Sequence, residues 1–296
     1  MDASPLFALS ASAAWAVGSL LFGHFGKRVT PGALNFAKCA SATLMLGATW
    51  AVLAGASGAP SAAPPPTAWA FITASALAGL TIGDTAYFAA IRELGVGRAI
   101  LLGGTAPLFA TLGGVVLFGE HVGAREVAGM SLTTLGVVAV VATNRGGGGT
   151  GRTALGVALG LFAALMQASG TMLSRSAMRH GIDPLLAATA RVFVASVSLA
   201  AVAGGRGEAR AWSRELARDR MLAKIAGAAF IGTYGGIWLS QLALAGQRST
   251  GVTSALLATS PIFALPIERF VLGVPHGVRA FAGAAVAIAG IALLSG

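Results

Sequence analysis

The feature that most constrains this chain is the recurrence of apolar segments about as long as a lipid bilayer is thick. A helix needs roughly 20 apolar residues to cross the hydrocarbon core. Only 10% of the 296 residues are charged, against about 25% in a typical soluble domain. We therefore expect an all-α, polytopic membrane protein with ten transmembrane helices, near residues 5–23, 33–54, 68–91, 96–119, 124–143, 154–174, 184–204, 222–245, 249–272 and 277–295.

The net charge of +10 does not indicate a nucleic-acid-binding protein. The basic residues occur singly or in short groups between apolar segments, without interleaved aromatic residues, as expected for loops that face anionic lipid. Cys39 is the only cysteine, which excludes an intramolecular disulfide and a cysteine-based metal site. We expect membrane lipid around the chain, with no nucleic-acid partner, no metal and no cofactor.

Loop charges predict the orientation. Asp2 is the only charge before His24, so the first segment lacks the positive region of a signal peptide and is expected to be a retained helix. If the N-terminus is outside, fourteen basic residues fall in the inner loops and their flanks, against four in the outer ones. Because positive loops stay in the cytoplasm, this asymmetry predicts an inner-membrane protein with both termini in the periplasm. The four outer residues are Arg125, Arg175, Arg179 and Arg248.

The chain contains an internal repeat. Residues 104–136 resemble residues 258–290 at a constant spacing of 154, and earlier residues match at about 153. Each copy holds five expected helices, and an odd number inserts the second copy upside down, with the substrate site near the midplane between the copies. We expect two inverted five-helix repeats, 1–143 and 154–296, joined by a Gly-rich linker, 144–153, and a monomer that suffices for function. The matched pairs include Thr105/Thr259, Pro107/Pro261, Phe109/Phe263, Arg125/Arg279 and Lys38/Arg191.

Two stretches, "GDTAYFAAIRELGVGRA" (83–99) and "TAPLFATLGGVVLFGEHVG" (105–123), together with the repeat, carry a family resemblance. The chain resembles the EamA-type branch of the drug/metabolite transporter superfamily over almost its whole length. The family's hallmark is a proline in the fourth helix and a glutamate thirteen residues later, which Pro107 and Glu120 match. Val274 stands at the second glutamate position, where the chain departs from the pattern. The resemblance implies a small-molecule carrier, usually an exporter of metabolites or amino acids.

Asp84 is the residue that least fits a hydrocarbon environment. It lies eight residues before Arg92, about 12 Å from that helix end at 1.5 Å per residue. A charge near the bilayer centre costs about 2.5–3.5 kcal/mol on insertion scales, so Asp84 should face a cavity or a partner, with Tyr87 on the same face. It is either a proton-coupling carboxyl or a structural aspartate bonded to another helix. Lys38 and Arg191 either extend to the membrane interface or form a charged lining that attracts a carboxylate or closes a gate with Asp84.

Three helix faces carry hydrogen-bonding and aromatic residues, which suit a pocket for an amphipathic organic solute. Such residues, taken singly, also serve as bonds between helices, but three faces together favour a cavity. The three faces comprise Ser12, Trp15 and Ser19; Gln167, Thr171 and Ser174; and Tyr234, Trp238 and Gln241.

Pro107 and Pro261 should remove backbone hydrogen bonds inside the fourth and ninth helices and kink them, which makes them candidate hinges. The four histidines lie at loop edges without a catalytic motif, so we do not expect an enzyme. A channel would be expected to carry rings of repeated charge from identical subunits. The sequence therefore predicts a secondary-active transporter, by resemblance an exporter, of small organic metabolites such as amino acids, with protons as a candidate coupling ion. The alternatives are a non-transporting scaffold and a passive facilitator or channel.

Overall fold

The structure, a computed structural model, describes residues 3–57, 63–119, 121–142, 153–246, 250–270 and 277–295. Within these ranges all regular structure is helical. The expected Gly-rich linker lies outside the described residues except for Thr153. Six segments are long and apolar enough to cross a membrane, namely Ser4–Phe25, Pro31–Ala54, Pro66–Leu94, Ala154–Arg179, Pro184–Gly205 and Ala209–Gly246.

The helices follow the same order in the two halves of the chain. The first half has α1 (Ser4–Phe25), α2 (Pro31–Ser57), α3 (Pro66–Ser75), η1 (Ala76–Gly83), α4 (Asp84–Leu94), α5 (Val96–Gly103), α6 (Ala106–Phe118) and α7 (Ala124–Ala142). The second has α8 (Thr153–Arg179), α9 (Pro184–Gly205), α10 (Ala209–Ala217), η2 (Arg218–Arg220), α11 (Met221–Ala229), η3 (Phe230–Gly235), α12 (Gly236–Gly246), α13 (Thr250–Leu257), α14 (Ser260–Phe270) and α15 (Val278–Ser295). Each expected apolar segment coincides with a helix or with successive helices in this order.

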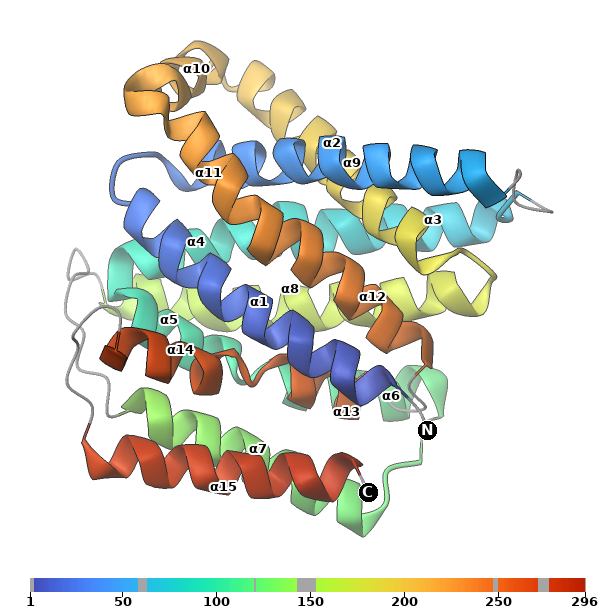
Figure 1. Ribbon diagram of the computed structural model, residues 1–296, viewed down its shortest axis with the longest axis vertical. Helices are drawn as coiled ribbons and strands as arrows, with labels where there is room; N and C mark the ends of the chain where they lie inside the picture. The colour runs from blue at the N-terminus through green and yellow to red at the C-terminus, as the bar shows by residue number, and fades with distance from the viewer. Residues whose placement is uncertain are drawn as a thin grey trace.

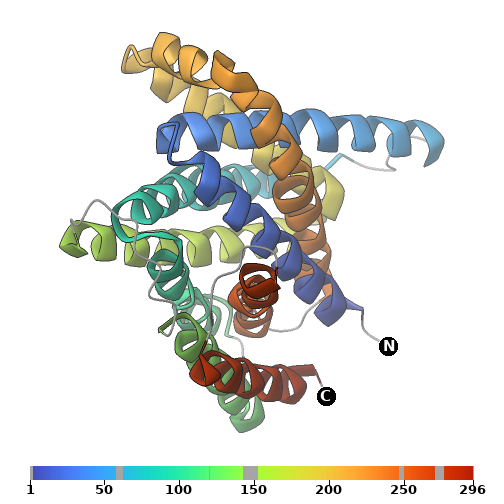
Figure 2. The same ribbon diagram turned by 60° about the vertical axis from the view of Figure 1, so that its left-hand side comes forward.

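Counterpart helices run in opposite directions. In Figure 1, α1 runs from right to left and α8 from left to right, and α2 and α9, like α7 and α15, are reversed in the same way. The contacts are reciprocal, because α1 packs on η3 and α12 while α8 packs on η1 and α4. The counterparts α2 and α9 also pack on each other, and α7 packs along α15 at one edge of the bundle (Figure 2). The two halves are therefore interleaved across a common interface.

Two glycine contacts set the closest crossings between the halves. Gly18 of α1 meets Gly232 of η3, and Gly170 of α8 meets Gly79 of η1 in the equivalent place. A methyl group on Gly18 would lie 2.8 Å from the Gly232 Cα, and one on Gly170 would lie 2.9 Å from the Gly79 Cα. Small residues let helix backbones approach this closely, so the crossings themselves restrict Gly18, Gly232 and Gly170 to glycine.

The same crossings contain the two π-helical segments, η1 and η3. The Asp84 N–H donates to the carbonyl of Gly79, and the Gly236 N–H donates to that of Ile231, five residues back in each case. Asn35 of α2 donates to the Leu80 carbonyl of η1 at 2.7 Å. π-helical turns are rare and concentrate at functional sites. Here the segment η1 leads directly into Asp84, the first residue of α4.

The two prolines that were expected to kink continuous helices stand instead near the start of new helices. Pro107 stands in the first turn of α6, and Pro261 is the second residue of α14. In each case a turn separates two helices, at residues 104–105 and at residues 258–259. A proline in the first helical turn costs little, because its missing N–H would have no partner there. The prolines therefore begin new helices instead of bending continuous ones, and their role as hinges stays a prediction.

The stretch 205–221, which lies between two of the expected transmembrane segments, contains the amphipathic helix α10 (Ala209–Ala217). Its Trp212 and Leu216 are buried, and the Trp212 ring lies 6.2 Å from that of Phe36 on α2. Glu215 accepts hydrogen bonds from the backbone N–H and the hydroxyl of Thr30, at 2.8 and 3.0 Å. Helix α10 is therefore fastened to the N-terminal end of α2.

Candidate functional site

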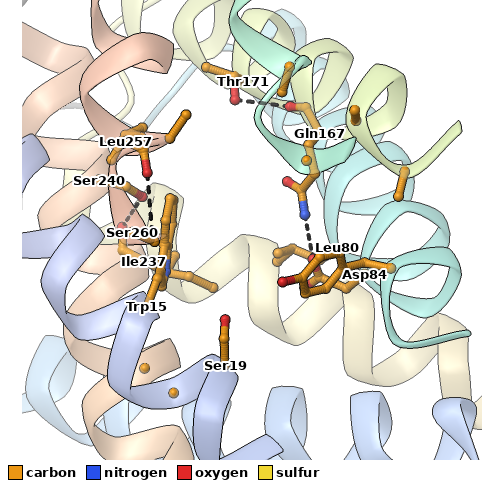
Figure 3. A pocket seen from close by; sticks show the side chains of 18 of the residues that line it. Trp15, Ser19, Leu80, Asp84, Gln167, Thr171, Ile237, Ser240, Leu257 and Ser260 are labelled. Atoms are coloured by element: carbon orange, nitrogen blue, oxygen red, sulfur yellow. Dashed lines mark hydrogen bonds between the residues drawn. The ribbon is translucent and has the colours of Figure 1, made fainter. Parts of the chain in front are cut away.

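A cavity of about 230 Å³ lies between the two halves of the bundle. Figure 3 shows Trp15, Ile237 and Ser240 on one side of it, facing Gln167 and Asp84 on the other. Most of its lining is apolar or small, including Phe22, Phe88 and Leu257. The cavity can therefore surround the organic part of a solute while a few polar groups orient it.

Many of the lining residues form pairs related by the repeat. Members of a pair stand 152 to 154 positions apart and come from counterpart segments of the two halves. The cavity therefore lies where equivalent helix faces of the two halves meet. The pairs include Trp15/Gln167, Ser19/Thr171, Lys38/Arg191, Asp84/Ile237 and Tyr87/Ser240.

Asp84 is buried, with 9% of its surface exposed. Its Oδ2 forms an ion pair with Lys38 Nζ, and its Oδ1 accepts a hydrogen bond from Gln167 Nε2. Lys38 is 5% exposed and its Nζ stands 5.3 Å from the ring centre of Phe88, so its head group is buried inside the helix bundle. Asp84 thus has both a cavity and partners, which is what its place in an apolar helix requires.

Arg191 occupies the equivalent position to Lys38 and is 6% exposed. Its Nε is buried and has no hydrogen-bond partner within the described part of the chain. The guanidinium lies over Gly79, where a methyl group would stand 3.1 Å from Nη2. Asp84 interacts electrostatically with both Arg191 and Lys38. The lining thus brings two cations, Lys38 and Arg191, around one carboxylate, and their role as a charged lining or gate stays a prediction.

The polar face of α1 is divided between the cavity and helix packing. Trp15 and Ser19 line the cavity, as does Tyr87 of α4. Ser12 instead lies within hydrogen-bonding distance of Thr259 (2.9 Å) and Ser260 (3.2 Å). This serine connects α1 to the second half of the chain.

The polar face of α8 is divided in the same way. Gln167 and Thr171 line the cavity, whereas Ser174 donates a hydrogen bond of 2.7 Å to Gln241 Oε1. Ser174 and Gln241 are both fully buried and bond α8 to α12. Ser174 and Gln241, which the sequence placed on candidate cavity faces, therefore join α8 to α12 and do not line the cavity.

Tyr234 and Trp238, like Gln241, are absent from the described cavity lining. The Tyr234 hydroxyl lies 3.1 Å from Thr49 Oγ1 on α2, and its ring stacks on Phe230. Residues one position away on the same helix line the cavity instead: Thr233, Ile237 and Ser240. The pattern of polar and aromatic residues along the helix did not predict these three. The repeat could have identified them, since they are the counterparts of Leu80, Asp84 and Tyr87 at a spacing of 153.

Glu120 and Val274, the hallmark positions of the two copies, lie outside the described residues. Within the described ranges, no three His, Cys, Asp or Glu side chains come together in a way that could hold a metal ion.

The family model of the EamA-like transporter family matches the chain twice, over residues 3–142 and 154–296. The chain belongs to this family. This EamA-like protein is therefore a multi-pass membrane protein of a transporter family, built from two copies of one repeat. A search of curated proteins found no match.

A solved structure, whose title says only that it is the crystal structure of a protein, superposes on the EamA-like chain with a TM-score of 0.74. The match covers 99% of this chain and 96% of the other, at 15% sequence identity. At that identity the likeness concerns the fold alone.

Proposed function

We propose that this EamA-like protein is a secondary-active carrier that exports a small organic metabolite, such as an amino acid or a related amphipathic compound, by alternating access. The observation that carries the proposal is the paired lining of the cavity between two oppositely running halves. Inverted repeats of this kind place the solute at the repeat interface and open it to either side by rocking one repeat against the other. The solute binds between Trp15 and Ile237 on one wall and Gln167 and Asp84 on the other.

The turns between the short helices α5 and α6, and between α13 and α14, supply the movement that alternating access needs. Gly104, in the turn between α5 and α6, and Ala258, in the turn between α13 and α14, both line the cavity. A change at either turn reorients a half-helix without bending its hydrogen-bonded body, as hinge residues at element ends do. The turns before Pro107 and Pro261 therefore open the cavity to opposite sides in alternation.

Counterflow of labelled solute in proteoliposomes tests the carrier directly. Vesicles preloaded with unlabelled solute should accumulate the label transiently above its outside concentration, because a carrier exchanges solutes across a shared site. A passive channel would equilibrate the label without overshoot. A non-transporting scaffold would show no protein-dependent flux, which would contradict the proposal.

Asp84 is the candidate for proton coupling. Protonation would remove its ion pair with Lys38 and change the charge of the cluster, so proton binding and solute binding would be coupled through that charge. Asp84→Asn keeps the shape and abolishes titration, and we expect it to lose gradient-driven accumulation while keeping solute exchange at equilibrium. A purely structural aspartate would lose folding, binding and exchange together. Accumulation at the wild-type level in the Asn variant would refute coupling through Asp84.

The same proposal includes ten transmembrane crossings in the inner membrane. The pairs α5–α6 and α13–α14, with α7 and α15, would add four crossings to the six long segments. The start of α1 and the end of α15 lie at one side of the bundle in Figure 1, opposite α10 and its arginines, which supports periplasmic termini under the positive-inside rule. Asp2→Cys in a Cys39→Ala background should react with an impermeant maleimide in intact cells. Reaction only after permeabilisation would reverse the orientation.

A further inference from the structure

The described lining of the cavity carries an uneven charge. Lys38 and Arg191 are its basic residues and Asp84 its acidic one. All three have at most 9% of their surface exposed. A charge at this depth in a membrane protein needs a counter-charge or strong hydrogen bonds. One carboxylate between two cations leaves an excess positive charge in the empty cavity.

Both oxygens of Asp84 already have partners. Oδ2 pairs with Lys38, and Oδ1 accepts from the Gln167 amide. A solute ammonium group would have to displace one of these donors, and a displaced Lys38 would then lie buried beside Arg191 without its carboxylate. Losing the partner of a buried ion pair is strongly destabilising. The charge cluster therefore disfavours a solute cation.

Arg191, unlike Asp84, has a polar group that a bound solute could satisfy. Its buried Nε lacks a hydrogen-bond partner in the described structure, and its guanidinium lies at the cavity wall over Gly79. A guanidinium matches a carboxylate with two parallel hydrogen bonds. A solute carboxylate at this place would supply both the missing charge and a partner for Nε.

The rest of the cavity suits an organic body. Trp15, Phe22 and Tyr87 contribute aromatic surface. Ser254 of α13, which also lines the cavity, is 7% exposed, and its hydroxyl has no hydrogen-bond partner among the described residues. A solute with a carboxylate at Arg191 and an apolar or aromatic part beside Trp15 would meet these surfaces.

Resting on the proposed carrier function, we propose that the substrate is an organic monoanion whose carboxylate binds Arg191, and not a zwitterion or a cation. A monoanion brings the charge of the cavity to zero without disturbing the Lys38–Asp84 pair. A zwitterionic amino acid would bring an ammonium group for which the cavity holds no free carboxylate. Within the metabolites named above, the cavity thus selects acids over amino acids.

The test compares four probes that share one phenyl skeleton, by calorimetry and thermal shift on the purified protein in detergent. They are 3-phenylpropionate (anion), phenylalanine (zwitterion), 2-phenylethylamine (cation) and 3-phenylpropanamide (neutral); hexanoate serves as a second anion. At least one anion should bind, with a dissociation constant at least tenfold lower than those of the three other phenyl probes. Tighter or equal binding of phenylalanine or the amine, or no binding of either anion, would overturn the proposal.

Variants then locate the anion. Arg191→Gln should weaken anion binding at least tenfold and abolish the preference over the neutral amide, and Arg191→Lys should retain part of that preference. Arg92→Gln removes an exposed arginine outside the cavity and serves as the matched control. It should change neither the affinity for the anion nor the preference over the neutral amide. An anion preference that survives Arg191→Gln would place the carboxylate elsewhere and refute the assignment. If Arg191→Gln does not fold, Arg191→Lys and the wild-type ranking of the probes decide the question.

Flux measurements separate this inference from the carrier function. Anion binding that depends on Arg191, without any counterflow of the bound anion, would leave the site intact and refute the carrier. Counterflow of phenylalanine that is unaffected by Arg191→Gln would support the carrier and refute the monoanion.

Discussion

Replacing Gly18 with alanine should force α1 away from η3 and destabilise the whole bundle. The new methyl carbon would lie 2.8 Å from the Gly232 Cα, whereas carbon atoms in favourable contact stand about 3.5–4.0 Å apart. The helices must therefore separate by about 1 Å. Because both atoms belong to rigid parts of the chain, the overpacking cost should reach the upper end of its usual range, about 3 kcal/mol. Alanine's better helix propensity offsets about 1 kcal/mol, leaving a net loss of about 2 kcal/mol.

Gly170→Ala is the matched perturbation in the other half, since its methyl group would lie 2.9 Å from the Gly79 Cα. Gly47→Ala in α2 is the control, because a methyl group there has no neighbour within 4 Å. At about 2–4 °C per kcal/mol, thermal unfolding in detergent should show a Tm about 4–8 °C lower for both crossing variants. The control should equal or exceed the wild type. Crossing variants as stable as Gly47→Ala would refute the reasoning, and a loss confined to one of them would refute the equivalence of the two crossings.

Two further predictions concern Trp15 and helix α10. Gly236→Ala would place a methyl group on the Trp15 indole, so we expect the ring to move into the cavity, with a shift in tryptophan fluorescence and about tenfold weaker solute binding (about 1.4 kcal/mol). Gly235→Ala, whose methyl group would meet only the Phe230 carbonyl at 3.7 Å, should leave both unchanged, and equal behaviour of the two variants would contradict the prediction. Glu215→Ala removes both hydrogen bonds to Thr30 and should cost about 1–2 kcal/mol in the free energy of unfolding. The neighbouring Arg214→Ala should be close to neutral in the same denaturation assay, and an unchanged stability of Glu215→Ala would show that α10 is not fastened through this contact.

The helical segments could be predicted because their determinants are local. Apolar length alone marks a segment such as α9, and the proline at its start and the aspartate before it mark its beginning. The Asp183 side chain does accept hydrogen bonds from Leu185 and Leu186, as an N-cap residue should. The burial of Asp84 with a partner also followed from its cost in an apolar helix. Its particular partners, Lys38 and Gln167, did not, because they depend on which helices cross.

The polar face of Tyr234, Trp238 and Gln241 shows where a pattern within one helix becomes insufficient. The spacing identified a face, but the partner of that face is decided by the glycine crossing. With Gly232 and Gly236 against α1, the next residues round the helix, Thr233 and Ile237, point to the cavity and Tyr234 points to Thr49 of α2. A shift of one residue turns a side chain by about 100° on a helix of 3.6 residues per turn. Aromatic and polar character alone could not show which of the two neighbouring helix faces lines the cavity.

The glycine crossings also have a consequence for biosynthesis. Gly18 is translated 214 positions before Gly232, its contact in the finished protein. At a synthesis rate of about 5–20 residues per second, α1 waits about 10–40 s in the membrane before η3 is made. During that interval its glycine face has lipid or another protein as its neighbour. The first half of this chain therefore passes through a long-lived unpartnered stage, in which an insertion factor or a membrane chaperone would have time to bind the face that η3 later covers.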